Sequence, residues 1–266
     1  MTEIAGLMSL KNRTAVITGG AGNLGQTLAE TLAELGANLV LVDLSGSSIE
    51  DLAANLSARF DVTVSSEICD LECEEQRKGL AERVTLGGDV DILINNAAFV
   101  GTSDLSGWSE TFEKQSLESW RRALEVNLTA AFHLSQLFSP SLTNSVGGSI
   151  INIGSIYGEL APDWSLYEGL NMHNPAAYGA SKAGLLQFTR WLSTALAPKV
   201  RVNAISPGGI QRGQHPDFIK RYSSKTPLGR MAEEGDLRGP IAFLASDMSA
   251  YMTGQVLNVD GGWGVW

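Results

Sequence analysis

The sequence contains few cysteines and histidines. Its 266 residues include two cysteines, Cys69 and Cys73, and three histidines. The cysteines are four positions apart, which fits neither a CxxC redox motif nor a zinc site. We therefore expect two reduced packing residues and no metal. Runs of Lys or Arg are also missing, and the net charge of -10 argues against nucleic acid or an anionic membrane as a partner. A small-molecule partner is expected instead.

Long hydrophobic segments and targeting signals are missing as well. No stretch approaches the roughly 18 apolar residues of a membrane span. The first ten residues include Glu3, lack a basic segment, and have too short an apolar run for a signal peptide. These features predict a cytoplasmic protein. Repeats, low-complexity stretches and linkers are absent, and the length of 266 residues predicts a single domain over residues 1–266.

Short apolar runs alternate with helical patterns along the whole chain. The runs that predict strands are residues 15–17, 38–42, 62–68, 91–94, 149–153, 200–205 and 256–259. The patterns that predict helices are residues 26–35, 74–84, 117–138, 176–197 and 237–245, with another helix beginning near Ser47. This alternation predicts an α/β fold with a doubly wound parallel sheet of about seven strands and helices on both faces. Ligands of such sheets bind beyond the carboxyl ends of the strands.

A glycine-rich turn, Thr18-Gly-Gly-Ala-Gly-Asn-Leu-Gly25, joins the first strand to the first long helix. Glycines allow the backbone to approach a pyrophosphate closely, and the free N–H groups at the start of a helix attract its negative charge. The turn therefore predicts a phosphate cradle, which includes Gly19, Gly22 and the segment Asn23-Leu24-Gly25. The alternative is a purely structural turn.

Asp43 ends the second strand, a little under twenty residues beyond Gly25. A carboxylate at this position can accept both hydroxyls of an adenosine ribose and would repel a 2′-phosphate. Neither Leu44 nor Ser45 is basic, and the glycine turn has no Arg or Lys. This pattern favours NAD over NADP. The alternative is a loop aspartate that caps the following helix.

Tyr178-Gly-Ala-Ser-Lys182 opens a long predicted helix. Residues four apart share a helix face, so the phenol and the ammonium group lie close together. A phenol titrates near ~10 when free, and a fixed positive charge beside it favours the phenolate. Tyr178 could then act as a general acid or base at neutral pH. Taken alone, the pentapeptide could equally belong to an ordinary surface helix.

Together these motifs resemble the short-chain dehydrogenase/reductase family, in its short single-domain branch. The resemblance rests on the order and spacing of Thr18-Gly19 to Gly25, Asn95-Asn-Ala97, Asn127, Ser155, Tyr178 with Lys182, and Pro207-Gly208. It covers essentially the whole chain. It implies an NAD(P)-dependent oxidoreductase that interconverts a secondary alcohol and a ketone.

The resemblance also implies roles for individual residues. Tyr178 would exchange a proton with the substrate oxygen while the nicotinamide exchanges a hydride with the carbon. Lys182 would hold the nicotinamide ribose and lower the pKa of Tyr178, and Ser155 would hydrogen-bond the reacting oxygen. Asn127 would hold a water in a proton relay to Lys182. Without the resemblance, Asn127 reads as an ordinary polar residue within a helix.

The remaining contacts implied by the resemblance lie at other strand ends. Asp70 and Leu71 would touch adenine, Asn96, Ala97 and Ala98 the adenosine side, and Pro207, Gly208 and Ile210 the nicotinamide amide. The chain departs from the family pattern at Asn23 and Ala98, where the family has glycine. Asparagine tolerates a left-handed backbone better than most residues, so we expect the cradle to be retained.

Residues 159–175 form an insertion that separates Ser155 from Tyr178 by 23 positions. Its aromatic and hydrogen-bonding side chains suit a sugar or another polyol, although a structural flap or subunit contact would explain it equally well. Basic side chains then gather in residues 210–231, where a substrate lid would lie; some could bind a phosphate or carboxylate, and a solvated helix face is the alternative. They are Arg212, His215, Lys220, Arg221, Lys225 and Arg230.

The insertion and the C-terminal sequence resemble a subgroup of flagellin-modification oxidoreductases in amino-sugar pathways. This likeness suggests a sugar phosphate or a nucleotide-linked sugar as substrate. The alternatives are a reductase of acyl or other hydrophobic ketones, a non-catalytic NAD-binding sensor, and a sugar epimerase or dehydratase. The chain lacks the extra C-terminal domain expected of the last class. The family also implies a homotetramer, with the Tyr178 helix, the last strand, Trp263 and Trp266 at interfaces.

Overall fold

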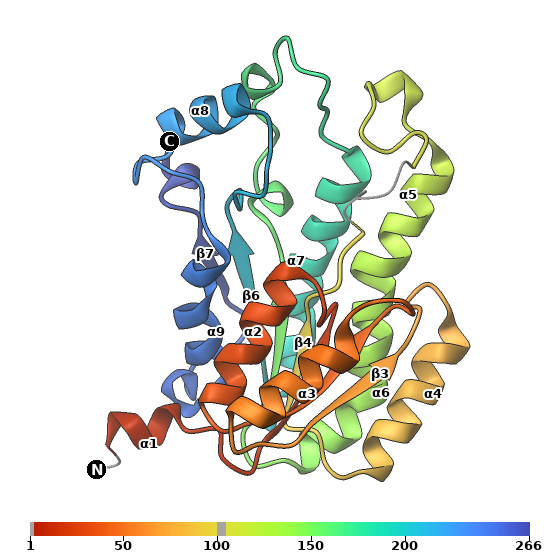
Figure 1. The fold of residues 1–266 in the computed structure, drawn as a ribbon, viewed down its shortest axis with the longest axis vertical. Coiled ribbons are helices and arrows are strands. Elements are labelled where there is room, and N and C mark those ends of the chain that lie inside the picture. Colours follow the sequence, from red (N-terminus) through yellow and green to blue (C-terminus); the bar gives the residue numbers. More distant parts are fainter. Residues whose placement is uncertain (1–2, 100–104) are drawn as a thin grey trace.

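One parallel β-sheet forms the centre of the protein (Figure 1). The computed structural model describes residues 3–99 and 105–266. The seven strands lie in the order β3-β2-β1-β4-β5-β6-β7, and each neighbouring pair is parallel. They span Thr14–Thr18 (β1), Asn38–Asp43 (β2), Val64–Ile68 (β3), Ile92–Asn95 (β4), Gly148–Ile153 (β5), Val200–Pro207 (β6) and Val256–Val259 (β7). The predicted doubly wound α/β fold is confirmed.

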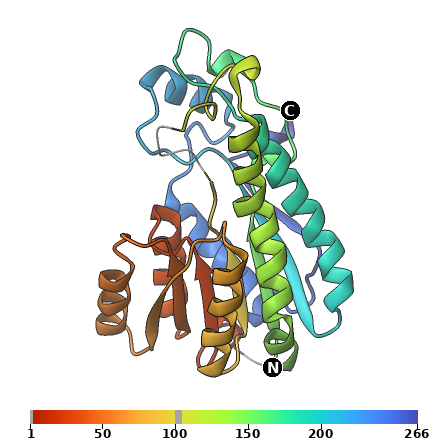
Figure 2. The ribbon, with the colours of Figure 1, turned by 90° about the vertical axis from the view of Figure 1, so that its right-hand side faces the viewer.

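Helices cover both faces of the sheet, as the views in Figures 1 and 2 show. They span Ile4–Met8 (α1), Asn23–Glu34 (α2), Ile49–Arg59 (α3), Glu74–Leu86 (α4), Leu117–Leu124 (α5), Ala130–Asn144 (α6), Ala176–Leu196 (α7), Pro216–Lys225 (α8) and Arg238–Ala245 (α9). Strand side chains alternate between two cores: Ala15 and Ile17 pack with α2, α3 and α9, whereas Val16 packs with α4, α6 and α7. Both cores are apolar, as a buried parallel sheet requires.

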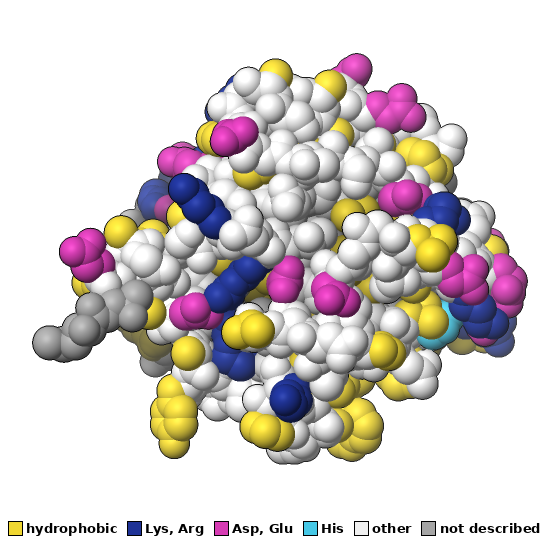
Figure 3. Space-filling model, turned by 90° about the horizontal axis from the view of Figure 1, so that it is seen from below, with side chains coloured by type: hydrophobic (Ala, Val, Ile, Leu, Met, Phe, Trp, Pro, Cys, Tyr) yellow, Lys and Arg dark blue, Asp and Glu magenta, His cyan; other side chains and the backbone are white. Residues whose placement is uncertain are grey.

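The two ends of the sheet differ. The carboxyl ends of the strands point upward in Figure 1, toward α8 and residues 159–175, which lie above the sheet. The other end is seen in Figure 3, where acidic and basic side chains are interspersed. Within the described ranges, every helix is too short or too polar to cross a bilayer.

The predicted helix at residues 117–138 is wrong in one respect: it is interrupted. Between α5 and α6 the chain forms a π-helical turn, Glu125–Thr129, and α6 then continues to Asn144. Asn127 lies in this wide turn and is buried. Turns of this kind are rare and often occur at functional sites. A sequence period of 3.6 residues contains no sign of the one added residue.

The first turn of helix α2 packs against the preceding glycine turn at Gly25. A Cβ atom on Gly25 would lie 2.0 Å from the carbonyl oxygen of Gly19 and 2.9 Å from the Cα of Gly20. Gly19 itself has a φ of +64°, which L-residues rarely adopt. The turn can therefore lie directly against the first residues of the helix only because both positions lack side chains.

We predict that Gly25→Ala destabilises the protein by about 1–3 kcal/mol or more, because the added methyl group pushes α2 away from the turn. Gly22→Ala is the matched control, since its Cβ would lie 3.4 Å from the nearest atom and its φ of -69° is open to any residue. The control should stay within about 0.5 kcal/mol of the wild type in denaturant unfolding. Equal stability of the two variants would contradict this account.

Candidate active site

One cavity of about 960 Å³ lies beyond the carboxyl ends of the strands. All of the predicted cofactor-binding residues and three of the four predicted catalytic residues line it. They are Gly19, Gly22, Asn23, Leu24, Gly25, Asp43, Leu44, Asp70, Leu71, Asn96, Ala97, Ala98, Ser155, Tyr178, Lys182, Pro207, Gly208 and Ile210. Asn127 is the exception, because it lies buried behind the wall. Residues from distant parts of the sequence thus meet at one site.

The glycine turn and Asp43 form one end of this cavity. Asp43 Oδ2 accepts a hydrogen bond from the Ala21 backbone N–H at 2.8 Å, and Oδ1 accepts one from the Leu44 N–H at 2.8 Å. A Cβ on Gly19 would lie 2.9 Å from the Cα of Ala97. The turn is therefore a narrow passage at the N-terminus of α2, and its size and dipole suit a diphosphate. The N-cap of α3 is Ser48, so the alternative that Asp43 caps this helix is excluded.

The loop after β4 is tied to the same turn. Asn96 Nδ2 donates to the carbonyl oxygens of Thr18 at 2.9 Å and Gly19 at 3.1 Å, and Thr18 Oγ1 accepts from the backbone N–H groups of Asn96 and Ala97. Deeper in the core, Asn95 Nδ2 donates to Asn152 Oδ1 at 2.8 Å. The Asn-Asn-Ala motif thus fixes the cradle from the side opposite α2.

Arg77 braces the cavity wall at Leu71, a role for which the sequence offered no signal. Only 3% of its surface is exposed, and its guanidinium donates to the Leu71 carbonyl oxygen, to Glu125 at 2.7 Å and to His133 Nδ1 at 3.1 Å. Burial and the neighbouring Arg77 charge lower the pKa of His133, which keeps this imidazole a neutral acceptor. Arg77 therefore ties Leu71 to the π-helical turn.

Lys182 joins α7 to the end of β5. Its side chain is buried, and Nζ donates to the carbonyl oxygen of Ile153 at 2.7 Å. The ammonium lies 5.8 Å from the ring centre of Tyr178. Burial lowers the pKa of Lys182 to about 8. An ammonium has three donors, so two remain for groups in the cavity.

Burial governs the titration of Tyr178 in the structure. It raises the pKa of the phenol, and the hydroxyl of Ser155 and the charge of Arg212 partly oppose that shift. The Lys182 ammonium donates to a strand carbonyl, and burial depresses its own pKa. The expected lowering of the Tyr178 pKa by Lys182 in the cofactor complex stays a prediction. Arg212, one of the basic residues that the sequence placed in a substrate lid, contributes a positive charge that acts on Tyr178.

Asn127 supports the site from behind. Its Oδ1 accepts from the Phe99 N–H at 2.6 Å, and its Nδ2 donates to Ser181 Oγ at 2.9 Å. Ser181 Oγ in turn donates to the carbonyl oxygen of Tyr178 at 2.8 Å. The Asn127 side-chain amide therefore joins the loop after β4 to α7. The expected water relay to Lys182 stays a prediction.

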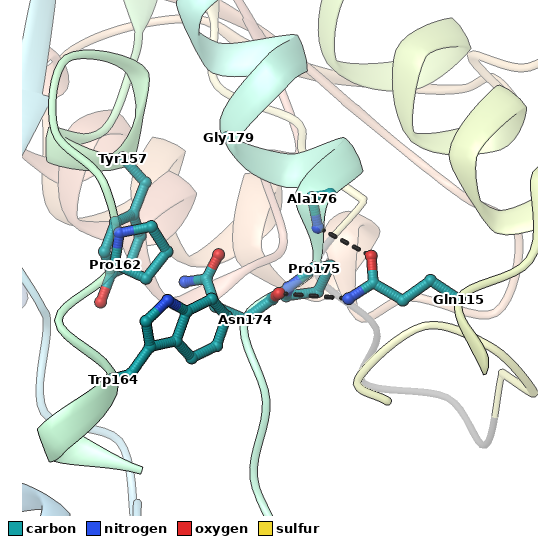
Figure 4. A pocket seen from close by; sticks show the side chains of 8 residues that line it. All are labelled: Gln115, Tyr157, Pro162, Trp164, Asn174, Pro175, Ala176 and Gly179. Atoms are coloured by element: carbon teal, nitrogen blue, oxygen red, sulfur yellow. Dashed lines mark hydrogen bonds between the residues drawn. The ribbon is translucent and has the colours of Figure 1, made fainter. Parts of the chain in front are cut away.

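A second, smaller pocket of about 190 Å³ lies under the insertion (Figure 4). Trp164 and Tyr157 form its aromatic walls, and the Asn174 carboxamide lies between them and the start of α7. Tyr157 lines both cavities. Its hydroxyl lies 3.0 Å from that of Tyr167, which also accepts from Asn174 Nδ2 at 3.3 Å. The small pocket is thus next to the end of the large cavity where Ser155 and Tyr178 lie, which we call the reactive end.

Most of the basic residues in 210–231 have structural partners. Arg221 donates to backbone carbonyls of the insertion, including Glu168 O at 2.6 Å, and Lys225 binds Asp163 and, at 2.8 Å, Ser165 Oγ. Arg230 forms two hydrogen bonds with Asp236. These residues hold the insertion and neighbouring loops in place. Of the basic candidates, Arg212 is the one that lines the large cavity.

The C-terminal tryptophans differ from each other. Trp263 stacks on Tyr222 with ring centres 4.2 Å apart and is partly buried. Trp266 is 83% exposed. On α7, a Cβ at Gly184 would lie 2.7 Å from Leu128, so this glycine allows close packing within the chain.

Comparison with known proteins agrees with this geometry. A family model described as enoyl-(acyl carrier protein) reductase matches residues 19–264. A tropinone reductase homolog of Arabidopsis thaliana is 34% identical over 97% of this chain and 94% of its own length. A 3-oxoacyl-[acyl-carrier-protein] reductase of Aquifex aeolicus is 30% identical (96% and 98%), and a probable galactose dehydrogenase of Rhizobium meliloti is 34% identical (95% and 95%).

Solved structures are similar over the full chain. An NADPH-dependent 3-quinuclidinone reductase of Rhodotorula rubra has a TM-score of 0.89 at 28% identity, covering 100% of this chain and 96% of that one. A putative NAD(P)-dependent gluconate 5-dehydrogenase of Beutenbergia cavernae, with NADP bound, has a TM-score of 0.87 at 31% identity, covering 98% and 100%. With this agreement in sequence and fold, the chain belongs to the short-chain dehydrogenase/reductase family and is a nicotinamide-dependent oxidoreductase acting on alcohol or ketone groups.

Proposed function

We propose that this protein interconverts a secondary alcohol and a ketone on a sugar or sugar-derived polyol, with NAD as cofactor. Phosphorylated and nucleotide-linked sugars, as in amino-sugar pathways, are included in this class. The observation that carries the proposal is the convergence of Tyr178, Ser155 and Lys182 at one end of a large cavity, next to an aromatic pocket under the insertion. A non-catalytic sensor would have no use for this proton-transfer set.

Each of the three side chains has a defined task. Bound nicotinamide supplies or accepts the hydride. Tyr178 gives its proton to, or takes it from, the substrate oxygen, and the Ser155 hydroxyl holds that oxygen in place. Lys182 has two donors left after its bond to Ile153, and these can hold a ribose hydroxyl and the phenolate that forms. Because Lys182 is buried, its charge acts on neighbouring groups more strongly than it would in water.

Asp43 supports NAD rather than NADP. Its carboxylate lies at the end of β2, where an adenosine ribose would be bound, and a 2′-phosphate would face that negative charge. Arg122, the basic side chain on the adenine side of the cavity, is bound to both oxygens of Glu72. Four similar structures bind NADP or use NADPH, so this preference rests on the residues of this chain.

The small pocket supports a polar, ring-shaped substrate. Trp164 is 59% exposed and offers an aromatic face, while the Asn174 carboxamide offers hydrogen bonds at the pocket wall. A sugar has both an apolar ring face and hydroxyl groups. The likeness to a galactose dehydrogenase and a gluconate dehydrogenase is in line with this class. The 3-oxoacyl reductase likeness and the apolar walls at Pro162, Pro175 and Ala176 favour the second candidate, reduction of an acyl ketone.

The proposal is tested by NADH formation or consumption on sugars, sugar phosphates, nucleotide sugars, polyols and acyl ketones. We expect turnover on a sugar or polyol, reduced about 100- to 10,000-fold or more in Tyr178→Phe, which loses the proton donor but keeps the ring. Turnover on acyl ketones alone would discard the sugar assignment. Cofactor binding without turnover of any substrate would favour the sensor.

Asp43 generates a separate prediction on cofactor choice. In Asp43→Ala, kcat/KM with NAD should fall about 10- to 100-fold relative to NADP, because charge-assisted hydrogen bonds to the ribose are lost and a phosphate is no longer repelled. Asp43→Asn keeps one acceptor oxygen, so its ratio of kcat/KM with NAD to that with NADP should lie between the ratios of the wild type and Asp43→Ala. A wild-type protein that prefers NADP would overturn the proposed preference.

Self-association into a tetramer is also part of the proposal. On α6 and α7, Phe132, Phe188 and Trp191 form a run of stacked or edge-on rings, and Trp191 is 61% exposed. β7 ends the order of strands in the sheet, so its outer edge is open to another chain. Apolar surface of this kind is typical of subunit interfaces.

Light scattering tests the association. The wild type should have the mass of a tetramer. Trp191→Arg should dissociate it into smaller species, because a charge would replace a ring that the proposed interface buries. Val146→Arg, at a residue 90% exposed in the loop between α6 and β5, is the matched control and should leave the mass unchanged. A monomeric wild type would refute the tetramer.

A further inference from the structure

Three basic side chains line the large cavity within the described residues: Arg122, Lys182 and Arg212. Two of them are already engaged. Arg122 is paired with Glu72 through its Nε and one Nη, and Lys182 is bonded to the Ile153 carbonyl beneath Tyr178. Arg212 is bonded through Nε to Glu234 Oε1 at 2.7 Å, which is its only side-chain bond in the described chain. Among residues 3–99 and 105–266, neither of its terminal nitrogens has a protein partner.

The backbone around Arg212 is firmly held. Its own N–H donates to Gln214 Oε1 at 2.7 Å, and Gln214 Nε2 donates to the Ile210 carbonyl at 2.7 Å. Gln211 N–H donates to the Ala232 carbonyl at 2.9 Å, in the bridge between Ile210 and Ala232. These bonds fix the segment that follows the Pro207 turn. The Arg212 side chain is 39% exposed, and Glu234 orients its guanidinium from the side of Nε.

The position of Arg212 is at the reactive end of the cavity. Its charge acts on Tyr178, where it opposes the effect of burial on the phenol pKa. The acidic side chains that line the cavity within the described residues lie at its proposed adenosine end. Asp43 is the last residue of β2, and Asp70 and Glu72 follow β3. The protein carries a net charge of -10, so an anionic ligand needs a local positive group at the reactive end.

We propose that Arg212 is a specificity-determining residue whose two free Nη groups bind an oxyanion, a carboxylate or phosphate carried by the substrate. A planar guanidinium with one edge held by Glu234 presents its remaining donors in a fixed fork, which matches the two oxygens of such a group. This inference rests on the proposed function and narrows its substrates to sugar acids or sugar phosphates. The same oxyanion chemistry is present in the diphosphate of the cofactor, and the test separates the two sources.

The test compares matched substrates with and without the anionic group: a sugar phosphate with its free sugar, and an aldonate with the corresponding polyol. In Arg212→Gln, the ratio of kcat/KM for the anionic to the neutral member should fall about 10- to 100-fold, mainly through KM, because a charge-assisted bidentate contact is lost. Arg212→Lys should recover part of the ratio. NADH affinity, followed by fluorescence titration, should change by less than about twofold.

Arg230→Gln is the matched control. It removes the same charge from the same segment, but Arg230 is bound to Asp236 and does not line the cavity. Its substrate ratio should equal that of the wild type. A ratio that falls equally in both variants, or an unchanged ratio in Arg212→Gln, would overturn the proposal. Equal loss on both members of each pair with weakened NADH binding would assign Arg212 to the cofactor diphosphate and would also overturn it.

A binding measurement keeps this inference separate from the proposed function. Inorganic phosphate and tartrate are titrated by calorimetry into the NADH-loaded wild type, Arg212→Gln and Arg230→Gln. Binding of either ion that is lost in Arg212→Gln and kept in Arg230→Gln supports the oxyanion site even if no substrate of the panel is turned over. Absence of binding to the wild type, or binding that survives in Arg212→Gln, contradicts the site even if a neutral sugar is a substrate.

Discussion

A hydrogen bond from a buried ammonium group to a strand carbonyl holds the reactive end of this protein together. Lys182 reaches from α7 to Ile153 at the end of β5, two residues before Ser155. Tyr178 is one turn earlier on the same helix, so this bond helps to set the distance between the phenol and the Ser155 hydroxyl. Burial makes the charge costly, as the lowered pKa of Lys182 shows. The ammonium is stable there because it donates to the carbonyl and faces a polar cavity.

The roof above this site is held by charges from distant parts of the sequence. Arg221 and Lys225 on α8 bind Glu168 O, Asp163 and Ser165 in the insertion, more than 50 positions away. An aromatic cluster that includes Tyr167 and Phe218 fills the space between them. The two segments therefore behave as one structural unit. Arg221 and Lys225 serve this contact, whereas Arg212, which precedes α8, lines the cavity.

The sequence predicted what depends on local pattern. Each β-strand and the Tyr178–Lys182 pair follow from hydrophobic runs and from a helix turn of four residues, so their positions agree with the structure to within a few residues. Features that depend on partners distant in sequence were not predictable. The Arg77–Glu125 pair spans 48 positions and the Arg212–Glu234 pair 22, and no local pattern distinguishes these arginines from solvated ones. The depressed pKa of Lys182 has the same origin, because burial arises only when β5 and α7 meet.

Family membership determines the framework of the protein, whereas individual residues determine which cofactor and substrate it binds. The sheet, the glycine turn and the Tyr178–Lys182 pair form the common framework, and a framework of this shape can accept either nicotinamide dinucleotide. In the proposed function, the choice between them depends on the charge at the end of β2, where the Asp43 carboxylate would lie within reach of the ribose. The substrate would be selected at the other end of the cavity, by the insertion and the segment after β6. Both decisions rest on side chains at strand ends, where a substitution changes the ligand without disturbing the core.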